Sequence, residues 1–163
     1  MTRLQKGLVV ALVQMLLVLL VAAKLVIDRA RYPDVWIETA PYDPESPLRG
    51  RYVRLLGVVE PAGEFGDDEP YYEPGRLEVR GDRLVAVPDP DGRVFFSRGF
   101  CPANRDCLTL SEPLAFFIPE DIADPSIRES GEELWVRVTV PPRGAPRPIE
   151  LGVKRGDELT PLG

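Results

Sequence analysis

One long apolar segment near the beginning of the chain restricts what the protein can fold into and where it can reside. Gly7 to Ile27 is 21 residues long and is interrupted only by Gln14 and Lys24. At about 1.5 Å per residue, a helix of this length matches the roughly 30 Å hydrocarbon core of a bilayer. Lys24 lies near one end, where its stem can reach the interface. The sequence therefore predicts a transmembrane helix.

A cleaved signal peptide is the alternative interpretation of this segment. Val21-Ala22-Ala23 offers the small residues that a cleavage site needs. The apolar core from Gly7 to Ala23 is 17 residues long, whereas the core of a signal peptide usually has about 7 to 15. This length favours an uncleaved anchor, and either interpretation directs the chain into the membrane export route.

The basic residues around the apolar segment do not fix its orientation. Arg3 and Lys6 precede it, and Lys24, Arg29 and Arg31 lie at or beyond its end. Counting by the positive-inside rule therefore gives no clear answer. Other features must decide on which side of the membrane the rest of the chain lies.

Composition excludes several classes of site. Residues 28–163 hold 17 basic and 26 acidic side chains, and an acidic domain repels nucleic-acid phosphates, so we expect no nucleic-acid partner. The chain has no histidine, which excludes Ser-His-Asp and Cys-His catalysis and histidine-ligated zinc or haem. The turn from Asp89 to Gly92 lacks the further oxygen ligands of a calcium loop. We therefore expect no metal, no cofactor and no enzymatic activity.

The part of the chain beyond the anchor predicts one domain of short strands. Its length of roughly 135 residues is typical of a single domain, and no amphipathic helix interrupts the alternating apolar pattern, so parallel crossovers are not expected. Gly81-Asp82 has the length and composition of a two-residue hairpin turn. We predict a mainly β fold, with an anchor and short linker over 1–31 and an antiparallel β-barrel or β-sandwich over 32–163. Strands are expected at 35–39, 52–59, 77–80, 83–87, 94–96, 108–110, 114–118, 134–140, 149–153 and from Leu159.

A proline-rimmed turn leads into the strand that begins at Tyr52. Three prolines between positions 41 and 47 exclude helix and favour a stiff extended loop. Gly50 follows, where the backbone can adopt a positive φ. A stiff loop loses little entropy on binding, so Asp43, Arg49, Gly50 and Tyr52 are candidate interaction residues. The alternative is that they only shape the turn and the core.

This region carries a resemblance to a known family. Asp43-Pro44-x-Ser46-x-Leu48-Arg49-Gly50-x-Tyr52-Val53-x-Leu55 resembles the signature of the GDYXXLXY family of bacterial membrane-anchored proteins. Arg51 stands at the aspartate of that signature and Gly57 at its last tyrosine. A second segment, Phe116-Phe117-Ile118-Pro119-Glu120, is similar to the aromatic-Phe-Val-Pro-Glu segment that follows in the family, with Asp121 in place of the usual glycine.

The resemblance implies a location and a partner rather than a reaction. The family has no established activity, and its members are often encoded beside multi-spanning membrane proteins. It implies a single-pass protein of the bacterial inner membrane, with an extracytoplasmic β-domain that contacts or supports another membrane protein. Leu55, Phe117, Pro119 and Glu120 join the candidate interaction residues through their places in the two motifs.

A membrane-bound serine hydrolase is the alternative function. A strand entered through Gly-x-Tyr-Val after a serine resembles the β-rich signal peptidases, whose serine is activated by a lysine. Ser46 would be the nucleophile, and Lys154 is the only lysine beyond the anchor. However, Arg155-Gly156-Asp157 marks Lys154 as a residue beside a turn.

The two cysteines bear on the side of the membrane. Cys101 and Cys107 are separated by Pro-Ala-Asn-Arg-Asp, a turn-rich pentapeptide that can bring their Cα atoms within disulfide range. Two unpaired structural thiols are the alternative, and a zinc site would need carboxylates for half of its ligands. We predict a disulfide, which would place the domain outside the cytoplasm.

We expect neither cysteine of the mature protein to react with a maleimide in denaturant until a reductant is added, because a disulfide has no free thiol. The single variants Cys101→Ser and Cys107→Ser serve as controls, and each should label without reductant. Mass spectrometry counts the labels. Two labels on the unreduced natural chain would show that no bridge forms.

Overall fold

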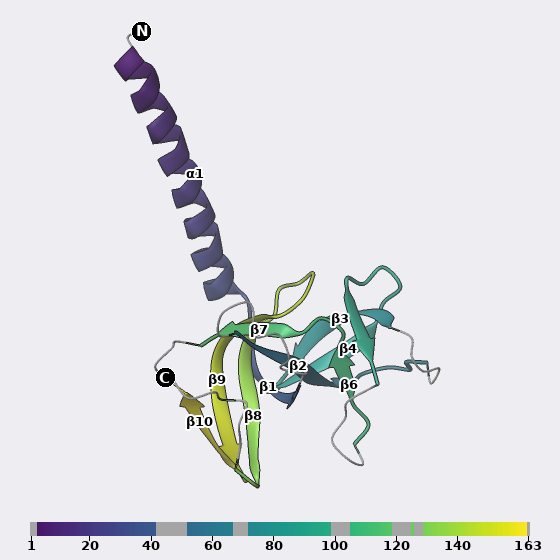
Figure 1. Ribbon diagram of the computed structural model, residues 1–163. Coiled ribbons are helices and arrows are strands. Elements are labelled where there is room, and N and C mark those ends of the chain that lie inside the picture. The colour runs from purple at the N-terminus through teal and green to yellow at the C-terminus, as the bar shows by residue number, and fades with distance from the viewer. Residues whose placement is uncertain are drawn as a thin grey trace. The chain divides into compact units, whose positions relative to one another are not determined.

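The computed structural model describes residues 3–41, 52–66, 72–98, 105–118, 125 and 129–162. The chain divides into two compact units, Met1–Tyr32 and Pro33–Gly163. Each unit is considered by itself (Figure 1).

The first unit is a single helix, α1 (Arg3–Arg31). Its apolar side chains between Leu8 and Ile27 are exposed along the whole segment. Arg29 and Arg31 lie in the last turn, where positive charge interacts favourably with the helix dipole. The stretch Gln5–Arg31 is long and apolar enough to cross a membrane, and a signal sequence has the same properties. The helix is thus compatible with a membrane anchor.

The described part of the second unit consists of strands joined by turns and loops. Their bounds are β1 (Asp34–Pro41), β2 (Tyr52–Pro61), β3 (Glu73–Arg80), β4 (Arg83–Pro88), β5 (Val94–Ser97), β6 (Leu108–Leu110), β7 (Leu114–Phe117), β8 (Glu132–Thr139), β9 (Arg147–Arg155) and β10 (Glu158–Leu162). The predicted mainly β fold is confirmed, and the strands lie where the alternating pattern placed them.

Five of the strands close into a barrel. Around the ring, β2 is followed by β4, β3, β5 and β6, and β6 pairs with β2 again. A ring with an odd number of strands cannot have only antiparallel neighbours. The exception is the pair of β2 and β4, which run parallel, with Glu60 opposite Val85 and Pro61 opposite Ala86. The predicted β-barrel is confirmed, and this one parallel pair is its departure from the expected antiparallel pairing.

This parallel pair needs no helical crossover. The chain leaves β2, forms β3, and returns through the predicted hairpin, in which Arg80 lies opposite Arg83 and Gly81 has a φ of 66°. The intervening antiparallel strand reverses the direction of the chain. A sequence without crossover helices can therefore still close the ring.

The other strands form an open sheet that extends from the barrel. The end of β1 pairs with β2 at Thr39–Pro41, and its beginning pairs with β8 at Asp34–Glu38. The sheet continues through β9 to β10, and Figure 1 shows β8, β9 and β10 beside one another. β7 pairs with the beginning of β2. β2 thus belongs to both the barrel and the open sheet.

One hydrophobic core fills the barrel and continues under the open sheet. Phe96 and Leu108 of the barrel belong to the same cluster of buried residues as Val136 of β8. Gly57 of β2 makes this continuity possible, because a Cβ there would lie 2.8 Å from Leu110 Cδ1 and 2.9 Å from Ile37 Cδ1. A leucine from the barrel and an isoleucine from the open sheet therefore pack over the same glycine.

We expect Leu55→Ala to lower the free energy of unfolding by about 2 to 5 kcal/mol, because Leu55 is only 2% exposed and its loss leaves a cavity. Arg54→Ala, at the exposed neighbouring position, should change it by no more than about 0.5 kcal/mol. Urea titration of the full chain in neutral detergent, followed by tryptophan fluorescence, measures both. Equal effects of the two substitutions would contradict the assigned core.

Candidate functional site

The two segments that resemble the family motifs lie next to each other in the fold. The beginning of β2 pairs with β7, so that Tyr52 lies opposite Phe117 and Leu55 opposite Leu114. These positions are more than 50 residues apart in the sequence. The strand pairing therefore joins the two motifs into one region.

The candidate interaction residues within this region differ in accessibility. Leu55 is buried in the core, whereas Phe117 is 57% exposed on β7. Arg54 and Ala115 lie opposite each other and are both exposed. Tyr52 is placed only by its backbone pairing. The remaining predicted interaction residues lie outside the described residues: Asp43, Arg49, Gly50, Pro119 and Glu120.

The proposed serine–lysine pair and the predicted disulfide each include a residue outside the described part of the chain. Ser46 lies outside the described residues, whereas the Nζ atom of Lys154 lies 4.4 Å from the ring centroid of Trp135. Cys107 is buried, but Cys101 lies outside the described residues, so the structure gives the disulfide no support. Among the described residues no group of three acidic or cysteine side chains could hold a metal ion.

The described domain carries a groove of about 980 Å³. One side is formed by the outer face of the open sheet, with residues of β1, β8, β9 and β10. The other side is formed by the end of β2, the turn between β3 and β4, and the segment Arg105–Cys107 that precedes β6. We call this surface the tryptophan groove, because Trp36 and Trp135, the only tryptophans of the chain, both line it.

Strand register brings the two tryptophans onto the same face of the open sheet. Trp36 lies opposite Arg137, and Trp135 lies between Glu38 of β1 and Gly152 of β9. Successive side chains of a strand point to opposite faces, so these residues point away from the core residues Val136 and Val138. Both tryptophans are half-buried.

Gly152 provides the space in which Trp36 lies. A Cβ at Gly152 would lie 2.9 Å from Cζ3 and 3.0 Å from Cη2 of the Trp36 ring. The indole therefore extends across the neighbouring strands to β9. The guanidinium carbon of Arg137 lies 5.9 Å from the Trp36 ring centroid, within the range of a cation–π contact.

Ion pairs connect the two sides of the groove and neutralise most of its charges. The Nη2 group of Arg105 donates to Oε2 of Glu38 at 2.7 Å, and the Glu38 side chain is only 11% exposed. This pair links the segment before β6 to the open sheet. Arg83 pairs with Glu60 at 3.3 Å on the barrel side.

Lys154 differs from the other basic residues that line the groove. In the described part of the chain it has no carboxylate partner, and its ammonium group lies over the Trp135 ring. Asp82 on the barrel side likewise has no ion pair within the described residues. The groove therefore combines two aromatic rings with one uncompensated charge of each sign.

Sequence reasoning missed this groove. Both tryptophans stand at outward-facing positions of strands, where the alternating pattern calls for polar residues. Large aromatic residues that gather into one exposed patch mark a contact surface. That signal was available at positions 36 and 135, but nothing in the sequence showed that β1 and β8 would be neighbours.

The fold and the groove define a class of protein: a single apolar helix, followed by a β-domain in which a five-stranded barrel shares a strand with an open sheet. Within that class, the chain belongs to the GDYXXLXY family, because the family model described as "GDYXXLXY protein" matches residues 14–151. The function of this family is uncharacterised. Neither the curated proteins nor the solved structures contain a match to the chain.

The structure explains one departure of this chain from the family signature. Gly57 occupies the position of the last tyrosine, and the space above it is filled by Ile37 and Leu110. A tyrosine ring at position 57 would occupy the same volume. The departure is therefore compatible with a well-packed core in this chain.

We expect Gly152→Ala to lower the free energy of unfolding by about 1 to 3 kcal/mol, because the added Cβ displaces the Trp36 ring. The matched control is the same substitution in a Trp36→Leu background, where most of this penalty should disappear. Urea titration of the four proteins gives the coupling free energy. An equal penalty in both backgrounds would contradict the contact between Gly152 and Trp36.

Proposed function

We propose that the protein is a non-enzymatic, membrane-anchored binding protein whose tryptophan groove holds an extended segment of a multi-spanning membrane protein. The observation that carries this proposal is the presence of both tryptophans of the chain in one groove of about 980 Å³. Tryptophan side chains are frequent energetic centres of protein interfaces, because they bury a large area with few rotatable bonds.

The charges of the groove specify the chemistry of the partner segment. Arg83 and Arg105 are paired with carboxylates of the domain itself, whereas Lys154 has no carboxylate partner among the described residues. We infer that the partner supplies an apolar side chain to the tryptophans and a carboxylate to Lys154. A basic residue near Asp82 would fix the direction of the bound segment.

The helix α1 supports binding to a partner in the membrane. An anchored domain is confined to a thin layer beside the bilayer, which raises its effective concentration toward membrane partners. We propose that the membrane is the bacterial inner membrane and that the domain lies on its extracytoplasmic side. A disulfide between Cys101 and Cys107 would agree with that side.

We expect a photoreactive amino acid at position 159, which lines the groove, to crosslink to one membrane protein in intact cells. Trp135→Ala should reduce this crosslink about tenfold, because it removes an aromatic contact of the interface. Lys154→Glu should reduce it similarly, and exchanging the partner's carboxylate for lysine should restore it. Mass spectrometry identifies the partner, and the purified pair then gives the dissociation constants.

Two controls distinguish the groove from other surfaces. Phe95→Ala removes an exposed aromatic residue outside the groove and should leave the crosslink unchanged. A photoreactive residue at position 117 tests the region where the family motifs meet. A crosslink from position 117 with none from 159 would assign the interaction to β7 and overturn the groove as the binding site.

A further inference from the structure

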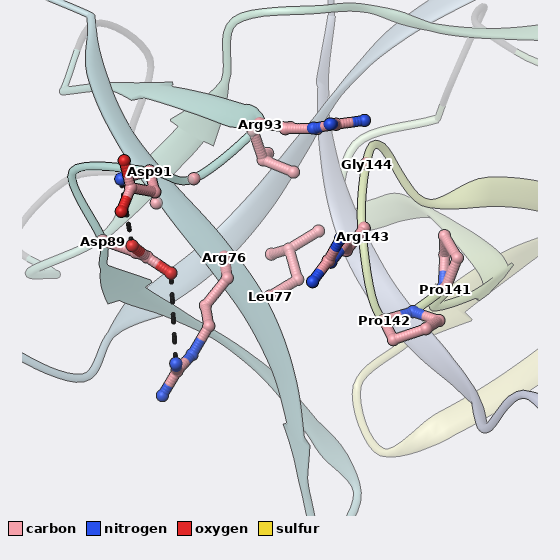
Figure 2. Close-up of a pocket in the computed structure, with 12 residues that line it drawn as sticks. Arg76, Leu77, Asp89, Asp91, Arg93, Pro141, Pro142, Arg143 and Gly144 are labelled. Atoms are coloured by element: carbon pink, nitrogen blue, oxygen red, sulfur yellow. Dashed lines mark hydrogen bonds and ion pairs between the residues drawn. The ribbon is translucent and has the colours of Figure 1, made fainter.

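A second pocket on the same domain is lined by three arginines. It has a volume of about 410 Å³ and lies between the beginning of β3, the turn between β4 and β5, and the turn that joins β8 to β9. Arg76, Arg93 and Arg143 each come from a different one of these segments, and Asp89 and Asp91 are its only acidic residues (Figure 2). The lining is therefore positive, although the chain as a whole has a net charge of −6.

Arg76 is already occupied by carboxylates of the domain. Its Nη2 group lies 2.9 Å from Glu78, and its Nη1 group lies 4.0 Å from Asp89. Hydrogen bonds from Arg80 and then Arg76 hold the pKa of Glu78 below its usual value, so Glu78 stays ionised at neutral pH. Arg76 therefore has little capacity left for a ligand.

Arg93 and Arg143 remain available. Neither forms an ion pair with any residue that the structure describes. In Figure 2 the carboxylates of Asp89 and Asp91 lie to the left, beside the turn, while the guanidinium groups of Arg93 and Arg143 lie to the right of them. Asp89 also accepts a hydrogen bond from the backbone N–H of Asp91 at 3.1 Å, which holds its carboxylate within the turn. Both arginines line the pocket, are exposed to solvent, and carry positive charges that no described carboxylate neutralises.

The turns that carry these arginines are conformationally restricted. A Cβ at Gly92 would collide with the backbone of Gly75, so the turn before Arg93 packs directly against β3. The Gly92 N–H also donates to the Asp89 carbonyl at 2.9 Å. On the other side, Pro141 and Pro142 precede Arg143, and Gly144 has a φ of 95°. Restricted turns lower the entropy that is lost when a ligand is bound.

We propose that this arginine pocket binds a phosphate group, held between Arg93 and Arg143. Two guanidinium groups from opposite turns match the charge of a phosphate monoester dianion and can donate paired hydrogen bonds to its oxygens. The volume lies within the usual range of ligand pockets and admits a small head group. Both free phosphate and the head group of an acidic phospholipid offer this chemistry.

The test uses the full chain in neutral-detergent micelles and isothermal titration calorimetry with two probes. One is sodium phosphate, and the other is dihexanoyl phosphatidic acid, with dihexanoyl phosphatidylcholine as its neutral comparison. We expect saturable binding that weakens as the salt concentration rises. Saturation by phosphate alone identifies a soluble ligand, and saturation by phosphatidic acid identifies a lipid head group.

Matched variants locate the site. Arg93→Gln and Arg143→Gln should each weaken binding at least about tenfold, since each removes one of two charged contacts. Arg54→Gln removes the same charge from an exposed position outside the pocket and should change binding by less than about twofold. Circular dichroism confirms that the three variants remain folded. Absence of saturable binding to both probes, or equal weakening in all three variants, would overturn the proposal.

Discussion

The structure depends on the hydrogen bonding of a single strand, β2, which is shared between two sheets. Successive segments of its ten residues pair with β7, β1, β6 and β4. Its two faces are also both buried, because Leu55 and Val59 face the main core while Leu56 and Val58 form a smaller cluster with Ala40 and Cys107. A strand in this position needs apolar side chains at nearly every residue. The sequence from Val53 to Val59 meets that demand.

The groove follows from the same arrangement. The end of β1 pairs with β2 of the barrel and its beginning pairs with β8 of the open sheet, so β1 joins the two parts. The concave surface is lined by residues of both parts, and the pair of Arg105 and Glu38 connects them. Each tryptophan is held on this surface by a neighbour. Trp36 packs against Gly152, and Trp135 lies beneath the ammonium group of Lys154. The two rings are therefore positioned before any partner arrives.

Local patterns in the sequence predicted the elements well, because each depends on nearby residues. The hairpin at Gly81-Asp82 and the alternation from Leu134 to Val140 are of this kind. The parallel pair of β2 and β4 was not predictable in this way, since it results from closing a ring with an odd number of strands. The two tryptophans are 99 positions apart, and only the pairing of β1 with β8 brings them together. Of the candidate interaction residues taken from the family motifs, Leu55 lies in the core and Phe117 is exposed on β7.

The closure of the ring has a mechanical consequence. Every other junction of the barrel is antiparallel, whereas β2 and β4 run parallel. This junction has two residue pairs, as do those of β6 with β2 and with β5, but one of its pairs contains Pro61, which has no N–H to donate. The Ala62 N–H donates to the Ala86 carbonyl at 2.7 Å and adds one hydrogen bond beside this junction. Strand junctions with few hydrogen bonds are among the first to open in local unfolding. Glu60 and Pro61 also border the tryptophan groove, so an opening of this junction would widen the surface beside it.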